Sequence, residues 1–185
     1  KDKLFTFLIF PQAKIIRQPF ECRGKKSIVL APGLSTGRYC RIETHDVNDT
    51  RSVLLRIGKD CQINDSVHIA AAESITLGDN VLIASRVFIS DLNHGSYSGN
   101  HHSLPDSLCR ERELSTRPII IHDNVWLGEG VVVLPGVVIG KNSIVGANSV
   151  VTKSIPENAI VAGNPARIVK TFCLISKKWS AYVPK

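Results

Sequence analysis

Apolar residues recur every six positions along two long stretches of the chain. The second stretch carries them at Ile121, Leu127, Val133, Ile139, Val145 and Val151. The first carries them at Ile57, Ile63 and Ile69 and, after a slip of two residues, at Leu77, Ile83 and Ile89. A glycine often follows the apolar residue, as at Gly58, Gly128 and Gly140. Neither an α-helix nor a long flat strand explains this period, because their side chains repeat about every 3.6 and 2 residues.

A six-residue period is typical of a triangular coil in which each side is one short strand. The apolar residue of each strand then points into a shared interior, and the small residue lets the backbone turn at the corner. Three hexads make one coil, so Ile121 is predicted to lie beside Ile139, and Leu127 beside Val145. One coil cannot bury its own inner face, so neighbouring coils must stack into a continuous core. The sequence therefore predicts an all-β fold, a parallel β-helix.

The pattern divides the chain into three parts. Residues 1–56 hold weaker hexads and are predicted to form an irregular N-terminal segment with the first coils. Residues 57–166 are predicted to form the β-helix, and residues 167–185 a short C-terminal tail. Within the helix, the polar segment 91–118 has no hexads and is expected to be an extruded loop. A loop of this length in a compact domain is usually functional.

The apolar segment 3–10 near the N-terminus is too short to cross a membrane, which takes about 20 apolar residues. The favoured interpretation is a terminal strand or helix that packs on the first coils. The alternative is peripheral contact with an anionic membrane, because Lys14, Arg17 and Arg23 follow closely.

Composition and charge narrow the functional classes. A length of 185 residues favours one domain, and only 6% aromatic residues leave a core of β-branched side chains. The net charge of +7 fits a phosphate-bearing cofactor or an anionic membrane. Nucleic acid ranks lower, because there is no aromatic–basic platform and no helix-turn-helix or zinc-finger spacing. Five widely spaced cysteines without a CxxC pair indicate reduced thiols of the cytoplasm rather than disulfides or a zinc site.

Five motifs follow one another along the repeats, at 77–83 (LGDNVLI), 121–128 (IHDNVWLG), 133–140 (VLPGVVIG), 145–153 (VGANSVVTK) and 162–166 (AGNPA). With these motifs the chain resembles the hexapeptide-repeat acyltransferases, in the branch that acetylates sugars. Segment 18–26 (QPFECRGKK) looks more like the lipopolysaccharide and capsule O-acetyltransferases than the galactoside and maltose enzymes. The resemblance implies a left-handed parallel β-helix, a homotrimer with active sites between subunits, acetyl-CoA as co-substrate and no metal.

The resemblance assigns the general base to His94, in the loop motif ISDLNHG. A sugar hydroxyl is a poor nucleophile near neutral pH, and an imidazole with an ordinary pKa of about 6.5 can accept its proton. Asp91 either orients the His94 ring or is a solvated loop carboxylate. His101 and His102 of the same loop either line the sugar pocket or have no role in the site. No cysteine holds a site position, so direct transfer without an acetyl-cysteine intermediate is expected.

Two further positions match residues with which the family binds the acceptor. Asn64 falls where sugar acetyltransferases keep an acceptor-binding asparagine, although an asparagine also suits a coil corner. Trp126 stands where the family has a tryptophan that lines the acceptor and pantetheine slot, facing His94 of the next subunit. Packing at the subunit interface is the other interpretation, and the two roles can coexist.

Positions that the family uses for coenzyme A correspond to Glu129, Ala147, Thr152, Lys153, Arg167 and Lys170. The family holds the pantetheine arm with backbone groups and the phosphates with basic residues near the C-terminal end. Lys153 and Arg167 are therefore expected to contact phosphate, where charge-assisted hydrogen bonds are strong. Solvated surface charge is the alternative, and the role of the Glu129 side chain is open because the family often has a small residue there.

The resemblance predicts an acetyl-CoA-dependent O-acetyltransferase that modifies a hydroxyl of a bacterial surface-polysaccharide sugar, in O-antigen or capsule. A cytoplasmic location is expected, with peripheral contact at the inner face of the cytoplasmic membrane as the variant. The alternatives are N-acetylation of a nucleotide sugar and a non-catalytic β-helix scaffold. A zinc carbonic anhydrase on the same fold would need an HxxxxH spacing, which the sequence lacks.

Overall fold

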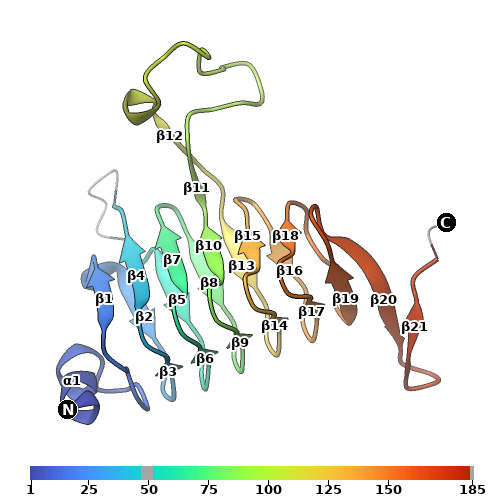
Figure 1. Ribbon diagram of the computed structural model, residues 1–185, viewed down its shortest axis with the longest axis horizontal. Coiled ribbons are helices and arrows are strands. Elements are labelled where there is room, and N and C mark those ends of the chain that lie inside the picture. Colours follow the sequence, from blue (N-terminus) through green and yellow to red (C-terminus); the bar gives the residue numbers. More distant parts are fainter. Residues whose placement is uncertain (47–51, 184–185) are drawn as a thin grey trace.

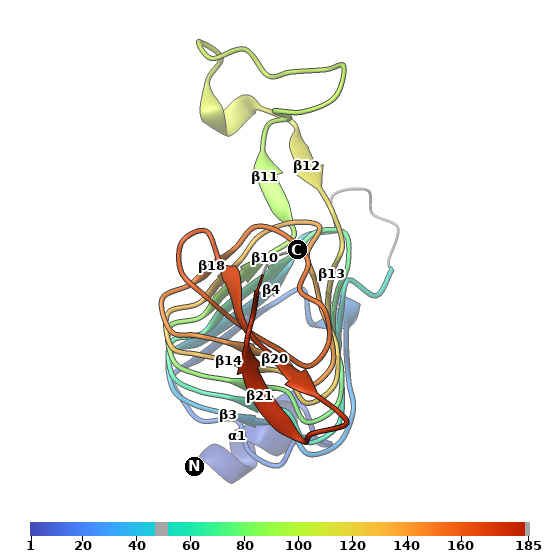
Figure 2. The same ribbon diagram turned by 90° about the vertical axis from the view of Figure 1, so that its right-hand side faces the viewer.

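The three sides of the predicted coil are present as three parallel sheets. The computed structural model describes residues 1–46 and 52–183, and its coils stack into a triangular β-helix (Figures 1 and 2). Sheet A contains β3 (Ser35–Thr36), β6 (Gln62–Ile63), β9 (Leu82–Ile83), β14 (Trp126–Leu127), β17 (Ile144–Val145) and β19 (Ala159–Ala162). Sheet B contains β1 (Phe20–Arg23), β4 (Cys40–Thr44), β7 (His68–Ala71), β10 (Phe88–Ser90), β15 (Val132–Val133) and β18 (Val150–Val151). Sheet C contains β2 (Ile28–Leu30), β5 (Leu55–Ile57), β8 (Ile75–Leu77), β13 (Ile119–Ile121) and β16 (Val138–Ile139).

The strand register confirms the six-residue period. Ile121 pairs with Ile139, and Leu127 pairs with Val145, in neighbouring coils. All four side chains are fully buried, because each occupies the inward position of its short strand. Burial of one such side chain stabilises the fold by about 1.5–3 kcal/mol. Neighbouring coils therefore supply the core that a single coil lacks.

An asparagine ladder forms the corner between sheets C and A. Asn124, Asn142 and Asn158 have φ values of 61°, 60° and 55°, in the left-handed region where asparagine is enriched. The side-chain amide of Asn124 donates to Oδ1 of Asn142 over 3.2 Å, and that of Asn142 donates to Oδ1 of Asn158 over 3.0 Å. The asparagine that recurs in the hexad motifs is thus required by the turn and bonded to the next coil.

The segment 91–118 leaves the helix at the corner between sheets B and C (Figure 1). It starts as β11 (Leu92–His94) and returns as β12 (Leu114–Thr116), and the two strands pair antiparallel. A short 3-10 helix, η2 (Cys109–Glu111), lies in the outer part of the loop. The polar break in the hexads therefore corresponds to a two-stranded ribbon with a long tip.

The N-terminal residues 1–46 cap one end of the helix and already contain strands of all three sheets. The apolar segment near the N-terminus is a helix, α1 (Asp2–Ile9), and η1 (Lys25–Ser27) is a single 3-10 turn. Thr6 and Phe10 are buried, whereas Leu4, Phe7 and Leu8 are 67%, 68% and 65% exposed. No helix within the described residues is long and apolar enough to span a membrane. Whether α1 touches a membrane surface stays a prediction.

At the other end, two antiparallel strands extend sheet A. β20 (Arg167–Cys173) pairs with β19, and β21 (Lys178–Ala181) pairs with β20. The predicted C-terminal tail is thus a hairpin over residues 167–181. The hairpin follows the last coil, and the described chain ends on the far side of the helix from α1 (Figure 1).

Candidate active site

The ribbon β11–β12 presents His94 to solvent. His94 pairs with Leu114 across the ribbon, and its side chain is exposed. Its backbone carbonyl accepts a hydrogen bond from the hydroxyl of Tyr97. Gly95 has a φ of +103°, and a Cβ there would lie 2.7 Å from the Tyr97 hydroxyl and 2.8 Å from Oγ of Ser103. The positive φ and the crowded Cβ position both require glycine at residue 95. The glycine of the His94 motif is therefore explained by the shape of the turn.

Asp91 anchors the base of this ribbon. Its side chain is 0% exposed, and the backbone N–H groups of Ala72, Glu73 and Ser74 donate to its carboxylate over 2.8, 2.9 and 2.8 Å. The interpretation of Asp91 as a solvated loop carboxylate is therefore wrong. Both of its oxygens bind the main chain of the preceding coil, so Asp91 positions the strand that carries His94 rather than the ring itself.

Several predicted site residues lie along the corner between sheets A and B, here called the A/B edge. The A/B edge consists of residues 64–66, 84–86, 128–130 and 146–148. It brings Asn64, Glu129 and Ala147 onto one line parallel to the helix axis. Glu129 forms an ion pair with Arg86 of the preceding coil. Gly128 lies so close to the next coil that a Cβ would be 2.7 Å from the backbone nitrogen of Ala147, so only glycine fits at this position.

The predicted acceptor residue Trp126 and the remaining coenzyme A positions lie on two other surfaces. Trp126 is 47% exposed on the outer face of sheet A, and Arg167 and Lys170 are exposed on β20 of the same sheet. Thr152 and Lys153 are exposed in the turn after β18, at the opposite end of sheet B from the A/B edge. The ribbon leaves from that same side, so one protomer does not bring the His94 region to the A/B edge (Figure 1).

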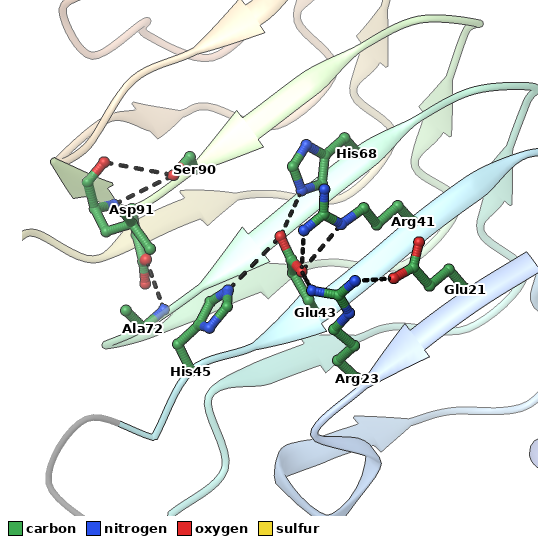
Figure 3. A network of polar contacts seen from close by, with 10 residues as sticks. Glu21, Arg23, Arg41, Glu43, His45, His68, Ala72, Ser90 and Asp91 are labelled. Atoms are coloured by element: carbon green, nitrogen blue, oxygen red, sulfur yellow. Dashed lines mark hydrogen bonds and ion pairs between the residues drawn. The ribbon is translucent and has the colours of Figure 1, made fainter. Parts of the chain in front are cut away.

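A buried carboxylate that the sequence interpretation missed lies on the outer face of sheet B (Figure 3). The Glu43 side chain is only 4% exposed. His68 Nε2 contacts Oε1 of Glu43 over 2.8 Å, and Arg41 donates to Oε2 from Nε over 3.0 Å and from Nη2 over 2.7 Å. His45 and Arg23 approach the same carboxylate to 3.6 and 3.7 Å. Strand alternation would have placed Arg41 and Glu43 on one face, but only the stacking of coils adds His68.

The pKa of Glu43 predicts how this network responds to acid. Burial raises the pKa, but the hydrogen bonds from His68 and Arg41 outweigh it and hold the pKa below its ordinary value. The network therefore stabilises the fold fully above about pH 4.3, and the contribution is lost as the pH falls through the lowered pKa. We expect Glu43→Gln to lower the free energy of unfolding at pH 7 by about 2–3 kcal/mol, as measured by urea titration. Between pH 6 and pH 3 the variant should lose less stability than the wild type; an equal loss would contradict this role.

The loop tip contains a small cavity of about 270 Å³. His101 and His102 line it together with Ser96, Ser103 and Glu113, and His102 Nε2 contacts the carbonyl of Gly99 over 2.9 Å. These contacts place both histidines at a polar cavity of the loop. A role of His101 and His102 in the sugar pocket stays a prediction.

The two buried cysteines are poor candidates for thiolate chemistry, and the described residues contain no cluster of metal ligands. Burial raises the pKa of the Cys40 and Cys61 thiols, which disfavours the reactive thiolate at both positions. All five cysteines are free. Across residues 1–46 and 52–183, no group of three His, Cys, Asp or Glu side chains is arranged to hold a metal ion.

Comparison with known proteins decides the family. The family described as bacterial transferase hexapeptide (six repeats) matches residues 118–153. WbbJ of Escherichia coli, named as a lipopolysaccharide biosynthesis O-acetyltransferase, is 41% identical over 97% of this chain and 89% of its own. The chain belongs to the hexapeptide-repeat transferases. The galactoside O-acetyltransferase of Escherichia coli is also 41% identical, over 82% of this chain and 70% of its own.

Solved structures agree with this assignment. A hexapeptide-repeat acetyltransferase of Vibrio cholerae, complexed with acetyl coenzyme A, is 31% identical with a TM-score of 0.58, over 82% of this chain and 70% of its own. The N-acyltransferase AntD of Bacillus cereus, complexed with dTDP and 3-hydroxybutyryl-CoA, has a TM-score of 0.71 at 23% identity, over 86% of this chain and 81% of its own. The second likeness supports the fold alone. The chain is an acyltransferase of the hexapeptide-repeat family, with its left-handed parallel β-helix.

Proposed function

We propose that this hexapeptide-repeat transferase moves the acetyl group of acetyl-CoA to a hydroxyl of a bacterial surface-polysaccharide sugar. The observation that carries the proposal is His94, an exposed imidazole on a ribbon that Asp91 and Gly95 fix in place. The relatives WbbJ and galactoside O-acetyltransferase, both named for O-acetyl transfer, support a hydroxyl acceptor. The likeness to WbbJ covers nearly the whole chain, which favours lipopolysaccharide over a small galactoside.

His94 would act as the general base. As the sugar oxygen attacks the thioester carbonyl, the imidazole accepts the hydroxyl proton, and the CoA thiolate leaves when the tetrahedral intermediate collapses. A backbone N–H would stabilise the developing oxyanion. The two substrates would react directly in a ternary complex. Holding the sugar hydroxyl next to the thioester makes the transfer effectively unimolecular, so no covalent enzyme intermediate is needed.

The A/B edge and the C-terminal coils fit coenzyme A. The small residues Gly128 and Ala147 would allow the pantetheine arm to approach the main chain closely. Lys153, Arg167 and Lys170 are exposed cations that could bind its phosphates. When bound, acetyl-CoA supplies the activated acyl group, and these residues would hold and orient it.

A homotrimer would complete the site. In the protomer the ribbon and the A/B edge lie on opposite sides of sheet B, so the His94 of one chain would have to serve the edge of another. Trp126, 47% exposed on sheet A, would then face the neighbouring ribbon. Sedimentation equilibrium should give three times the protomer mass; a monomer with full turnover would contradict this arrangement.

Release of free CoA thiol from acetyl-CoA tests the proposed activity. The acceptor panel would contain free sugars, nucleotide sugars with hydroxyl or amino groups, and extracted polysaccharide. Acceptor-dependent release with O-acetylated product supports the proposal, whereas transfer only to an amino sugar would establish N-acetylation instead. If neither release nor CoA binding occurs, the protein is a non-catalytic scaffold, and stoichiometric zinc would reopen the carbonic anhydrase interpretation.

A further inference from the structure

A groove of about 620 Å³ runs along sheet A at its N-terminal coils. It lies against β3 and β6 and the chain that follows α1, and its volume falls within the roughly 300–1,000 Å³ of small-molecule sites. Its lining contains three cations, Lys14, Arg17 and Arg38, and one carboxylate, Asp65. Asn64, the predicted acceptor-binding residue, lines the same groove.

The two arginines are held by the main chain. Nη1 of Arg17 donates to the carbonyl of Thr36 over 2.8 Å, and Nη1 of Arg38 donates to the carbonyl of Gln18 over 2.5 Å. Each of these bonds restrains the arginine side chain. Because a guanidinium carries five N–H donors, each arginine keeps further donors beyond the Nη1 group that binds the carbonyl. The remaining N–H groups of a planar guanidinium are donors of the kind that binds phosphate oxygens.

The one carboxylate that lines the groove is hydrogen-bonded to the main chain. Oδ1 of Asp65 accepts a hydrogen bond from the backbone N–H of Arg38 over 2.7 Å. Gln62 donates to Oδ1 of Asn64 over 3.0 Å, which leaves the Asn64 amide N–H₂ free to donate to an acceptor oxygen. The groove lining thus combines the neutral amide pair of Gln62 and Asn64 with three cations and only one carboxylate.

We infer that this groove binds a phosphate or diphosphate group of the acceptor, with the sugar toward Asn64. The acceptor would be a glycosyl phosphate or diphosphate, linked to a nucleotide or a lipid, rather than a neutral finished polysaccharide. The inference rests on the proposed function for the identity of the acceptor. It does not concern coenzyme A, because the cations at Lys153, Arg167 and Lys170 belong to the other end of the helix.

Titration calorimetry with inorganic pyrophosphate tests the groove without any turnover. Pyrophosphate should bind the wild type, and the double variant Lys14→Gln/Arg17→Gln should bind it about tenfold more weakly or worse. A matched control, Lys177→Gln/Lys178→Gln, removes two exposed cations of the β20–β21 hairpin, one in its turn and one at the start of β21. This control should bind pyrophosphate as the wild type does. Acetyl-CoA affinity should be the same in all three proteins.

A second variant guards against loss of folding. Among the described contacts, none involves the Lys14 ammonium, so Lys14→Glu should fold normally and still weaken pyrophosphate binding. No binding to the wild type, or equal binding to the groove variants, would overturn the inference. Failure of thiol release with pyrophosphate binding intact would instead count against the proposed function alone.

The source of the phosphate follows from two further probes. Uridine diphosphate that binds more tightly than pyrophosphate would indicate a nucleotide-linked acceptor. Farnesyl diphosphate that binds more tightly would indicate a lipid-linked one. Equal affinity for all three would support the diphosphate itself as the recognised group.

Discussion

Replacement of His94 by alanine is expected to lower kcat by about 10²- to 10⁴-fold, which is the usual contribution of a general base. The KM for acetyl-CoA should change little, because the side chain lies on the ribbon and not on the A/B edge or the C-terminal coils. Steady-state release of CoA thiol and calorimetric binding of CoA would separate the two effects.

His122→Ala is the matched control for this experiment. His122 is exposed just after β13, at the corner between sheets C and A and away from the ribbon. Its removal should leave kcat within about twofold of the wild type, since surface substitutions have small effects. Undiminished turnover in His94→Ala would remove the assigned base and, with it, the proposed mechanism.

Replacement of Asp91 by asparagine is expected to lower the free energy of unfolding by about 3–5 kcal/mol, although the shape of the side chain is kept. The carboxylate accepts three backbone N–H bonds over 2.8–2.9 Å while fully buried. An amide would turn one of these acceptors into a donor that faces a donor, and buried unsatisfied or uncompensated groups are costly. Urea titration would measure the loss. Because Asp91 anchors β11, kcat should fall as well, with CoA binding unchanged.

Asp106→Asn controls for the general effect of a lost carboxylate. Asp106 is exposed at the tip of the same loop, so its replacement should change stability by less than about 0.5 kcal/mol. If Asp91→Asn were as stable as this control, the three bonds to the corner would not be what holds the ribbon in place.

The candidate site separates the residues that a sequence can propose from those that it cannot. His94 and Asn64 stand beside recognisable motifs, and Gly95 and Gly128 are required by local turn geometry or by the close approach of a coil. Asp91 was visible as a loop carboxylate, but its burial was not, since its partners at residues 72–74 belong to the preceding coil. In a β-helix a side chain often bonds to residues of the neighbouring coil. The sequence distance between such partners cannot be read from the pattern of a single hexad.

The Glu43 network and the basic groove illustrate the same limit. Arg41 and Glu43 follow from strand alternation, but His68 joins them only because β4 and β7 are neighbours in sheet B. In the groove, Arg17 and Arg38 are brought together with Asn64 through the stacking of β3 on β6. Neither cluster has a sequence motif of its own, because its members are spread over the first coils.

The sequence by itself determined the repeating coil, the inward apolar stack and the position of the extruded loop. All three follow from the six-residue period. A shift of one residue in the repeat would turn an inward apolar side chain such as Leu127 or Val145 out of the core. Only the tertiary structure decided which polar residues meet, and that one protomer holds His94 and the A/B edge on opposite sides of sheet B. The physical reason is that apolar burial depends on periodicity along the chain, whereas hydrogen bonds and ion pairs depend on distances between coils.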